Sequence, residues 1–342
     1  MNILIIKLSA IGDVIHALAI PPFIKETFKD AHIAWAVEKA AAPLVEASPD
    51  VDDVIVVPKK EIRSLKGFIK NIVPLKNSLQ SRKYDYSLDL QGLLKSALVA
   101  KLANAKTKLG TANMREGSCF ISKSVKGKHK DGHIVERYLD VARAMGAKGE
   151  PKGFRLNMPS EVKSKVHKIL ENIAGNFSTD IERLRYAALI IGGNWPNKRW
   201  GAENFAKLSD ALFEKGIAPV IFGAGKIDEE TRNEIFERAE HNPMDLVNKT
   251  NLLDAAELLS KAKIAVGGDT GLMHMAAGLG VRCVMLMGPT NKERNGPFLQ
   301  EENAIEVNRD CKGCWKRKCP KDLDCLSAIS VNTVMENVNE VI

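Results

Sequence analysis

The stretch Ile264-Ala-Val-Gly-Gly-Asp-Thr-Gly-Leu-Met-His-Met-Ala-Ala-Gly-Leu-Gly280 decides the fold. A short apolar run of strand type, residues 263–266, leads into it, and residues 272–279 have helical character. Between the two, Gly267 and Gly268 are expected to relax the backbone. The stretch therefore predicts a strand end, a tight turn and a helix start, which together form a βα unit.

The turn of this unit has the chemistry of an anion site. Asp269, Thr270 and Gly271 lie where the helix N-terminus exposes unpaired amides, and these amides and the helix dipole suit a phosphate or pyrophosphate. Asp269 and Thr270 can equally act as simple helix caps. His274 favours the ligand interpretation, because a histidine in the first helical turn points back toward the N-terminus, where its imidazole can donate to phosphate oxygen.

Strand and helix patterns alternate along the whole chain, so the fold class is α/β with parallel sheets. Strands are expected at residues 2–7, 32–37, 54–57, 86–90, 107–110, 186–192, 218–222, 245–247, 263–266 and, as the last strand, 282–287. Helices are expected at residues 14–28 (kinked or split by Pro21 and Pro22), 40–47, 59–73, 93–103, 133–145, 159–176, 205–215, 228–239, 252–261 and 272–279. Two domains are expected, residues 1–158 and 159–342, with a return of the C-terminal tail onto the N-terminal domain left open.

The first βα unit excludes two common functions. It lacks the Gly-x-Gly-x-x-Gly turn of dinucleotide binders and the Gly-x-x-x-x-Gly-Lys-Ser/Thr loop of nucleotide triphosphatases, which argues against hydride transfer and ATP hydrolysis. Asp13 follows the first strand, at the sheet edge where open α/β sheets bind ligands, although a cap role is equally open. The loop at residues 111–132 is long enough to suggest a functional segment.

The charge is concentrated in the N-terminal half. The formal net charge is +8, and residues 59–131 alone contain 17 Lys and Arg against five acids, a net of +12. Such a surface attracts nucleic acid, anionic lipid or an acidic glycan. For the basic amphipathic helix at 59–73, contact with a membrane is the minority interpretation. No apolar run reaches the ~20 residues of a membrane span and no signal segment is visible, so a cytoplasmic location is expected.

Four of the six cysteines crowd into one C-terminal loop. They are Cys311, Cys314, Cys319 and Cys325. The Cys-x-x-Cys pair has the spacing of zinc ligands, but the second pair does not repeat it. A structural metal, a disulfide and free thiols all stay open.

Four motifs in order resemble the bacterial heptosyltransferases of glycosyltransferase family nine, over nearly the whole chain. They are Lys7-Leu-Ser-Ala-Ile-Gly-Asp-Val-Ile-His16, Asp89-Leu-Gln-Gly-Leu-Leu-Lys-Ser96, His133-Ile-Val-Glu-Arg137 and Gly268-Asp-Thr-Gly-Leu-Met-His-Met-Ala-Ala277. The first three look like type I members, which build the lipopolysaccharide inner core. A type II member with another acceptor remains an alternative.

The resemblance implies a GT-B fold of two Rossmann-like domains, with the acceptor on the N-terminal one and ADP-L-glycero-β-D-manno-heptose on the C-terminal one. It implies inverting transfer to the Kdo of Kdo-lipid A at the inner membrane surface, with Asp13 as general base and no metal required. The donor-binding residues it implies are Gly193, Asn194, Lys198, Glu229 (preferred to Asp228), Asp269, Thr270, Gly271 and His274. The acceptor-binding candidates are Ser9, Gly12, Arg63, Lys66, Lys95 and Arg115.

Two alternative functions belong to classes of protein other than glycosyltransferases. A nucleic-acid-binding protein would explain the basic segment, but the aromatic residues there are scattered and the Gly268–Ala277 motif would have no role. An inactive binding protein would be expected to have lost Asp13 or His274, and both are present.

Overall fold

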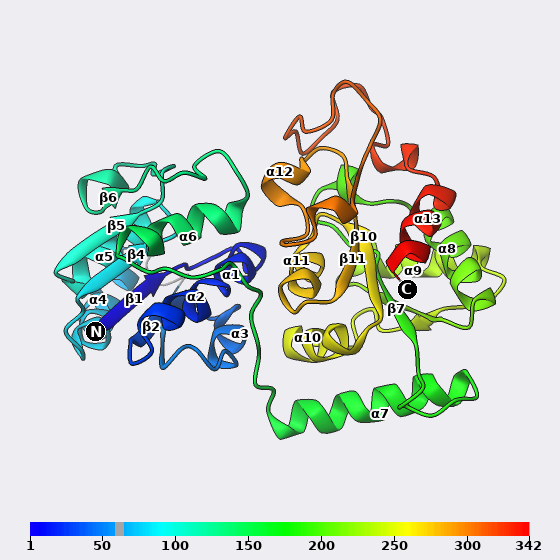
Figure 1. Ribbon diagram of the computed structural model, residues 1–342, viewed down its shortest axis with the longest axis horizontal. Helices are drawn as coiled ribbons and strands as arrows, with labels where there is room; N and C mark the ends of the chain where they lie inside the picture. Colours follow the sequence, from blue (N-terminus) through cyan, green and yellow to red (C-terminus); the bar gives the residue numbers. More distant parts are fainter. Residues whose placement is uncertain (59–64, 342) are drawn as a thin grey trace. The chain divides into compact units, whose positions relative to one another are not determined.

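The computed structural model describes residues 1–58 and 65–341. The chain divides into two compact units, Met1–Asn157 and Met158–Ile342, so the division lies one residue from the expected boundary. Each unit is an α/β structure built on a parallel sheet (Figure 1).

The first unit contains, in its described residues, a six-stranded parallel sheet with the strand order β3-β2-β1-β4-β5-β6. Its strands are β1 (Asn2–Ile6), β2 (His32–Glu38), β3 (Asp53–Val57), β4 (Tyr86–Asp89), β5 (Thr107–Gly110) and β6 (Lys123–Ser124). Its helices are α1 (Ile11–Ala17), α2 (Ile20–Thr27), α3 (Ala42–Glu46), α4 (Leu65–Gln80), α5 (Leu94–Ala103), the short 3-10 helix η2 (Ser118–Phe120) and α6 (Ile134–Ala144).

Two helices of the first unit show how proline acts. Pro21 and Pro22 lie in the first turn of α2, where a missing N–H is tolerated, and they separate α2 from α1 as expected. Helix α4 continues past Pro74 to Gln80, so the predicted end at residue 73 is wrong. Leu75 and Leu79, which are 4% and 0% exposed, pack into the core beyond the proline and hold this last part of the helix.

The second unit repeats the architecture with the strand order β12-β11-β10-β7-β8-β9. Its strands are β7 (Tyr186–Ile190), β8 (Ala218–Phe222), β9 (Met244–Asp245), β10 (Ile264–Gly268), β11 (Arg282–Met287) and β12 (Ala304–Glu306). Its helices are α7 (Ser160–Asn176), η3 (Pro196–Lys198), α8 (Ala202–Glu214), α9 (Lys226–Arg238), α10 (Leu252–Lys261), α11 (Gly271–Gly278), α12 (Lys292–Asn295), η4 (Glu301–Asn303), η5 (Leu326–Ala328) and α13 (Val331–Val341).

The C-terminal part of the second unit differs from the expectation. Residues 282–287 are not the last strand, because β12 pairs in parallel with β11 at the edge of the sheet. Helix α13 buries Val334 and Val338 in the core of the second unit, beside Trp200, whose indole donates to the carbonyl of Ile329 at 2.9 Å. The tail therefore belongs to the core of its own unit.

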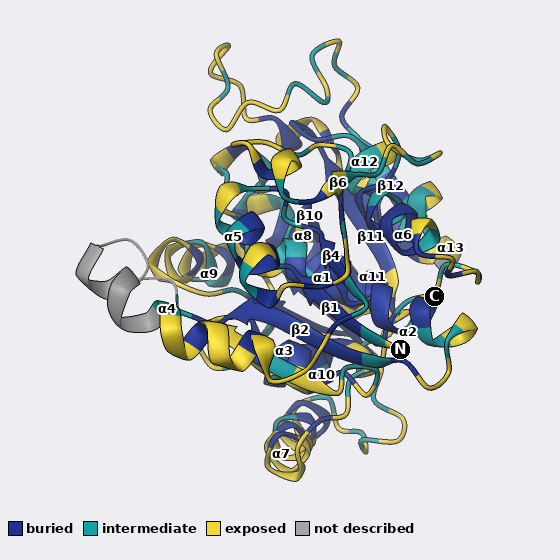
Figure 2. Cartoon of the chain, turned by 90° about the vertical axis from the view of Figure 1, so that its left-hand side faces the viewer, coloured by how far each residue is buried: buried dark blue, intermediate teal, exposed yellow. Residues whose placement is uncertain are grey.

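The central strands are buried on both faces, as the continuous apolar runs predict. Every residue of β1 from Ile3 to Ile6 is fully buried, and β1 pairs with β2 on one side and β4 on the other. Figure 2 shows β1 and β2 in dark blue, in contrast to the exposed face of α7. Within the described residues, no helix is long and apolar enough to cross a membrane.

Candidate functional site

The turns that follow β1 and β4 are bound to one another at the carboxyl edge of the first sheet. The Gln91 side-chain oxygen accepts from the amides of Leu8 and Ser9 at 3.1 and 3.2 Å. Asp89 shapes the second turn by accepting from the amides of Gln91 and Gly92 at 3.0 and 2.9 Å. Burial raises the pKa of Asp89, although these hydrogen bonds oppose the rise. The Asp89–Ser96 motif thus positions the loop that leads to Asp13.

Asp13 lies in the first turn of α1 with its carboxylate about half exposed, at 47%. The Lys7 ammonium is buried and lies 3.6 Å from this carboxylate. It also donates to the carbonyl of Leu90 at 3.2 Å and lies 5.1 Å from the centre of the Tyr138 ring. Burial lowers the pKa of Lys7, but Tyr138 and Asp13 outweigh burial and hold it above its usual value. Asp13 is therefore an accessible carboxylate beside a fixed cation, which the sequence analysis did not single out.

The third N-terminal motif reaches the same region. The His133 imidazole caps α6 by accepting from the amide of Val135 at 3.3 Å. Its ring meets that of His16 edge to face at 6.2 Å between centroids, and both residues are buried. Three motifs that are far apart in sequence therefore converge around Asp13 within the first unit.

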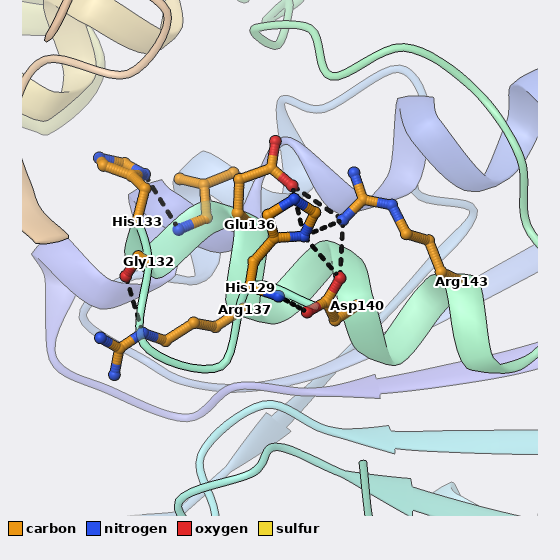
Figure 3. A network of polar contacts seen from close by, with 8 residues as sticks. His129, Gly132, His133, Glu136, Arg137, Asp140 and Arg143 are labelled. Atoms are coloured by element: carbon orange, nitrogen blue, oxygen red, sulfur yellow. Dashed lines mark hydrogen bonds and ion pairs between the residues drawn. The ribbon is translucent and has the colours of Figure 1, made fainter. Parts of the chain in front are cut away.

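A polar network anchors the end of the 111–132 loop to α6 (Figure 3). The His129 amide donates to Asp140 at 2.7 Å, and the Arg143 guanidinium donates to Glu136 and Asp140, both at 2.8 Å. Burial favours a neutral Asp140, but the hydrogen bonds from His129 and Arg143 prevail and lower its pKa. The loop is consequently attached to the domain by charged groups.

The acceptor candidates have different surroundings. Ser9 lies in the turn held by Gln91, and Gly12 lies in the first turn of α1 beside Asp13. Lys95 forms an ion pair with Glu38 at 2.5 Å, and Arg115 is exposed. Arg63 lies outside the described residues, and Lys66 is part of α4 with a side chain that is also outside them.

The second unit gathers a charged cluster at the carboxyl end of β10. Asp269 is buried, and its carboxylate lies 2.6 Å from the Lys198 ammonium and 2.7 Å from the His274 imidazole. The Asn295 amide approaches it at 3.5 Å. Burial opposes ionisation, but the hydrogen bond from His274 and the charge of Lys198 prevail and hold the pKa of Asp269 well below its usual value. The ionised form of Asp269 is therefore favoured, and its carboxylate orients two cationic or donor groups.

Gly267 and Gly268 are required by space. A side chain at Gly268 would place its Cβ 2.1 Å from the carbonyl oxygen of Lys198, and one at Gly267 would place it 2.7 Å from that of Ile190. Neither glycine has a positive φ, so the predicted relaxation of the backbone is not their role. Gly268 lets the loop that carries Lys198 approach the end of β10, and Gly267 lets the backbone of β7 approach at Ile190.

Unsatisfied polar atoms surround this cluster. Thr270 caps α11 with its backbone only, and α11 begins at Gly271. In the described part of the chain, the buried side-chain oxygens of Thr270, Thr290 and Asn291 have no hydrogen-bond partner. They follow the neighbouring strands β10 and β11, where a polar ligand would supply the missing bonds. For Thr290 and Asn291, the only signal in the sequence was the Gly288-Pro-Thr290 turn at the end of a strand.

The remaining donor candidates lie in the turns after β7 and β8. Asp228 is buried and lies 2.8 Å from the Arg199 guanidinium, and it also accepts from the amide of Ala224 at 2.8 Å. Glu229 is 51% exposed at the start of α9. Asp228 thus has a structural role, and Glu229 keeps an accessible carboxylate. Gly193 and Asn194 lie in the loop after β7, where the Gly193 carbonyl accepts from Arg199.

The C-terminal cysteines lie in the loop after β12. All four are free thiols, and Cys325 packs against Gly288. Burial raises the pKa of Cys325, and two backbone amides lower that of Cys319. Among the described residues, no group of three or more His, Cys, Asp or Glu side chains is placed to bind a metal.

Known proteins resemble the chain over most of its length. The lipopolysaccharide heptosyltransferase 2 of Salmonella typhimurium is 28% identical over 313 residues, covering 90% of this chain and 88% of that one. The lipopolysaccharide heptosyltransferase 1 of Escherichia coli is 28% identical over 326 residues, covering 91% and 95%.

Solved structures share the fold. A family 9 glycosyltransferase from Veillonella parvula superposes with a TM-score of 0.82 at 22% identity, covering 99% of this chain and 96% of that one. The E. coli heptosyltransferase WaaC, solved with ADP, gives 0.76 at 24% identity and full coverage of both chains. The expected pair of Rossmann-like domains of the GT-B class is confirmed.

The profile of one family matches residues 72–323, nearly three quarters of the chain. Its description is "Glycosyltransferase family 9 (heptosyltransferase)". The chain belongs to this family and is a glycosyltransferase.

Proposed function

We propose that the enzyme transfers L-glycero-D-manno-heptose from ADP-heptose to the Kdo of Kdo-lipid A. The observation that carries this proposal is the cluster of Lys198, Asp269 and His274 at the start of α11, with unsatisfied hydroxyls beside it. The names of the relatives and the ADP in the WaaC structure support the donor. A cytoplasmic location at the inner membrane belongs to the same proposal.

Asp13 is the proposed general base. Its accessible carboxylate takes the proton of the acceptor hydroxyl, the oxygen attacks the anomeric carbon, and the bond to the diphosphate breaks as ADP departs. The Lys7 ammonium lies 3.6 Å from the carboxylate that accepts this proton. A single displacement of this kind inverts the configuration at the anomeric carbon.

The donor cluster stabilises the leaving group. Lys198, His274 and the free amides at the start of α11 oppose the negative charge that grows on the diphosphate, and Asp269 holds the first two in place. We propose Gly193, Asn194 and Gly271 as further donor contacts and Glu229 as the partner of the ribose. These groups suffice for the chemistry, so the reaction should persist when EDTA is present.

The acceptor side depends on the basic residues of the first unit. We propose that Ser9, Gly12, Arg63, Lys66 and Arg115 contact the acceptor, with Lys95 as a weaker candidate because Glu38 pairs with it. Neutralising Arg63 and Arg115 together should raise the KM for the acceptor and leave that for the donor unchanged.

The deciding experiment incubates the protein with ADP-heptose and Kdo-lipid A and measures ADP release. Release that depends on both substrates, with a product of inverted configuration by NMR, supports the proposal. The type I motifs predict that Kdo-lipid A is preferred to an acceptor that already carries one heptose. A preference for the heptosylated acceptor would assign type II, and no release with either acceptor would refute the proposal.

A further inference from the structure

The segment between β5 and α6, residues 111–132, has a surface that the proposed chemistry does not use. It runs along one edge of the first unit (Figure 1). The Phe120 side chain is 88% exposed, the largest exposure among the large hydrophobic residues of the described chain. Exposed cations follow it in sequence at Lys123, Lys126, Lys128 and Lys130.

Phe120 is held in the solvent by an ordered turn. The Ser118 hydroxyl, fully buried below it, donates to the carbonyls of Gly92 and Arg115 at 3.0 and 2.7 Å. Gly117 begins the turn with φ +76°, which favours glycine. Because the turn is fixed at its base, the exposure of Phe120 is a feature of the fold.

A second apolar side chain lies beside this turn. Leu94, the first residue of α5, is 63% exposed, and its amide donates to the Glu116 side chain at 3.1 Å. Large apolar side chains on two neighbouring elements, α5 and η2, are therefore exposed. Such exposed apolar groups mark interaction sites when they are contiguous.

Three of the lysines, at 126, 128 and 130, alternate in sequence with Gly127 and His129. The His129 amide donates to Asp140, and a Cβ at Gly127 would lie 2.2 Å from a carboxylate oxygen of Asp140, so both positions face α6. The intervening Lys126, Lys128 and Lys130 are exposed. The anchoring thus displays a row of cations to solvent.

These cations have little compensation from the protein. Within the described residues, Lys123, Lys126 and Lys128 make no ion pair, and Lys130 lies 3.8 Å from an exposed Asp131. The whole first unit carries 26 Lys and Arg against 16 Asp and Glu, a net charge of +10. An exposed aromatic side chain beside uncompensated cations fits the interface of an anionic lipid bilayer.

We propose that Leu94, Phe120 and the four lysines form a docking surface for an anionic lipid bilayer. The two apolar side chains enter the interfacial region, and the ammonium groups contact lipid phosphates. The inference rests on the proposed function in one respect, that the acceptor is a lipid presented at such a bilayer. Stacking on nucleic acid would need several interleaved aromatic residues, and the segment has only Phe120.

Flotation with vesicles of phosphatidylcholine, with and without phosphatidylglycerol, tests the proposal on the full chain. Binding to the anionic vesicles is expected, weakening as NaCl is raised. Phe120→Ser should reduce this affinity about tenfold, and Lys126→Gln with Lys128→Gln should reduce it about fivefold per lysine. Ile227→Ser and Lys226→Gln remove an exposed apolar residue and an exposed cation of the second unit, and should change nothing.

A fluorescence measurement tests the same contact if the Phe120→Ser variant fails to fold. Phe120→Trp should be quenched by brominated lipids in anionic vesicles, and Ile227→Trp should not. Vesicle affinity that is unchanged in Phe120→Ser, or Phe120→Trp fluorescence that brominated lipid leaves unquenched, overturns the proposal. Displacement from vesicles by inorganic phosphate beyond the effect of NaCl at equal ionic strength also overturns it, because the site would then bind free phosphate.

Activity on a soluble acceptor separates this inference from the proposed function. With a Kdo acceptor that lacks acyl chains, Phe120→Ser should transfer heptose at the wild-type rate. Vesicle binding without any transfer by the wild type would refute the proposed function and leave docking supported. Transfer without vesicle binding would support the function and overturn docking.

Discussion

Replacing Lys198 by methionine should destabilise the second unit through the charge that it leaves behind. The ammonium lies 2.6 Å from the Asp269 carboxylate, and the two side chains are 12% and 3% exposed. Removing one partner of a buried ion pair costs about 3–5 kcal/mol. Asp269 keeps the His274 imidazole at 2.7 Å, which leaves it partly compensated. We therefore expect a loss of about 1.5–3 kcal/mol, the range of a lost hydrogen bond to a charged group.

Urea denaturation followed by tryptophan fluorescence measures this loss. Trp195, Trp200 and Trp315 all belong to the second unit, so a Trp35→Phe background restricts the signal to that unit. The matched control is Lys207→Met, which breaks an exposed pair with Glu203 at 2.6 Å. It should cost under about 0.5 kcal/mol.

A double variant tests the explanation. Lys198→Met combined with Asp269→Asn removes the stranded charge. The double variant should therefore lose less free energy of unfolding than the sum of the two single losses, by about 1 kcal/mol or more. A loss in Lys198→Met that equals that of Lys207→Met, or strict additivity in the double variant, would refute the reasoning.

Three further predictions concern the pH dependence of stability, the space around two glycines, and catalysis. Because the pKa of Asp269 is depressed in the folded protein, the stability that this carboxylate contributes is present above about pH 4 and declines as the pH falls below that value. The difference in urea stability between wild type and Asp269→Asn should therefore shrink from about pH 5 to about pH 3, and a constant difference would contradict this. Gly268→Ala should cost more than about 3 kcal/mol or prevent folding, because the new Cβ meets the Lys198 carbonyl. Gly175→Ala lies in α7 with open space around it and should raise the stability by up to about 1 kcal/mol. Equal melting temperatures of the two variants would contradict this prediction. If the proposed function holds, Asp13→Asn should lower kcat about a hundredfold or more with little loss of stability, since the carboxylate is half exposed and 3.6 Å from Lys7; near-normal turnover would exclude Asp13 as the base.

The sequence predicted the parts of the fold that depend on local pattern. Strands such as β1 and β10 are continuous apolar runs that end in turn residues, and the helices between them have a clear period. Strand β12 has only three residues and was missed, because so short a run carries no periodic signal. The end of α4 was misplaced because Pro74 is a local stop signal that the packing of Leu79 overrides.

In the site, too, contacts within one stretch of sequence were predictable and contacts between distant stretches were not. Asp269 and His274 are only five residues apart, in the turn before α11 and in its first part, so their proximity follows from local structure. The contacts of Asp269 with Lys198 and with Asn295 join separate elements of the fold. Such contacts depend on how the elements pack, which no single stretch of sequence records. The hydroxyl of Thr290 was missed for this reason.

The two adjacent glycines at the end of β10 limit how this enzyme can be engineered. Since any side chain at Gly267 or Gly268 would meet a neighbouring carbonyl, the floor of the site there is main chain, and mutagenesis has almost no freedom to reshape it. If the proposed function holds, the side chains that can be varied to change donor preference are those of Thr290, Asn291 and Asn295, which follow β11. A combinatorial library aimed at a new donor should randomise those three codons and leave the glycine pair untouched.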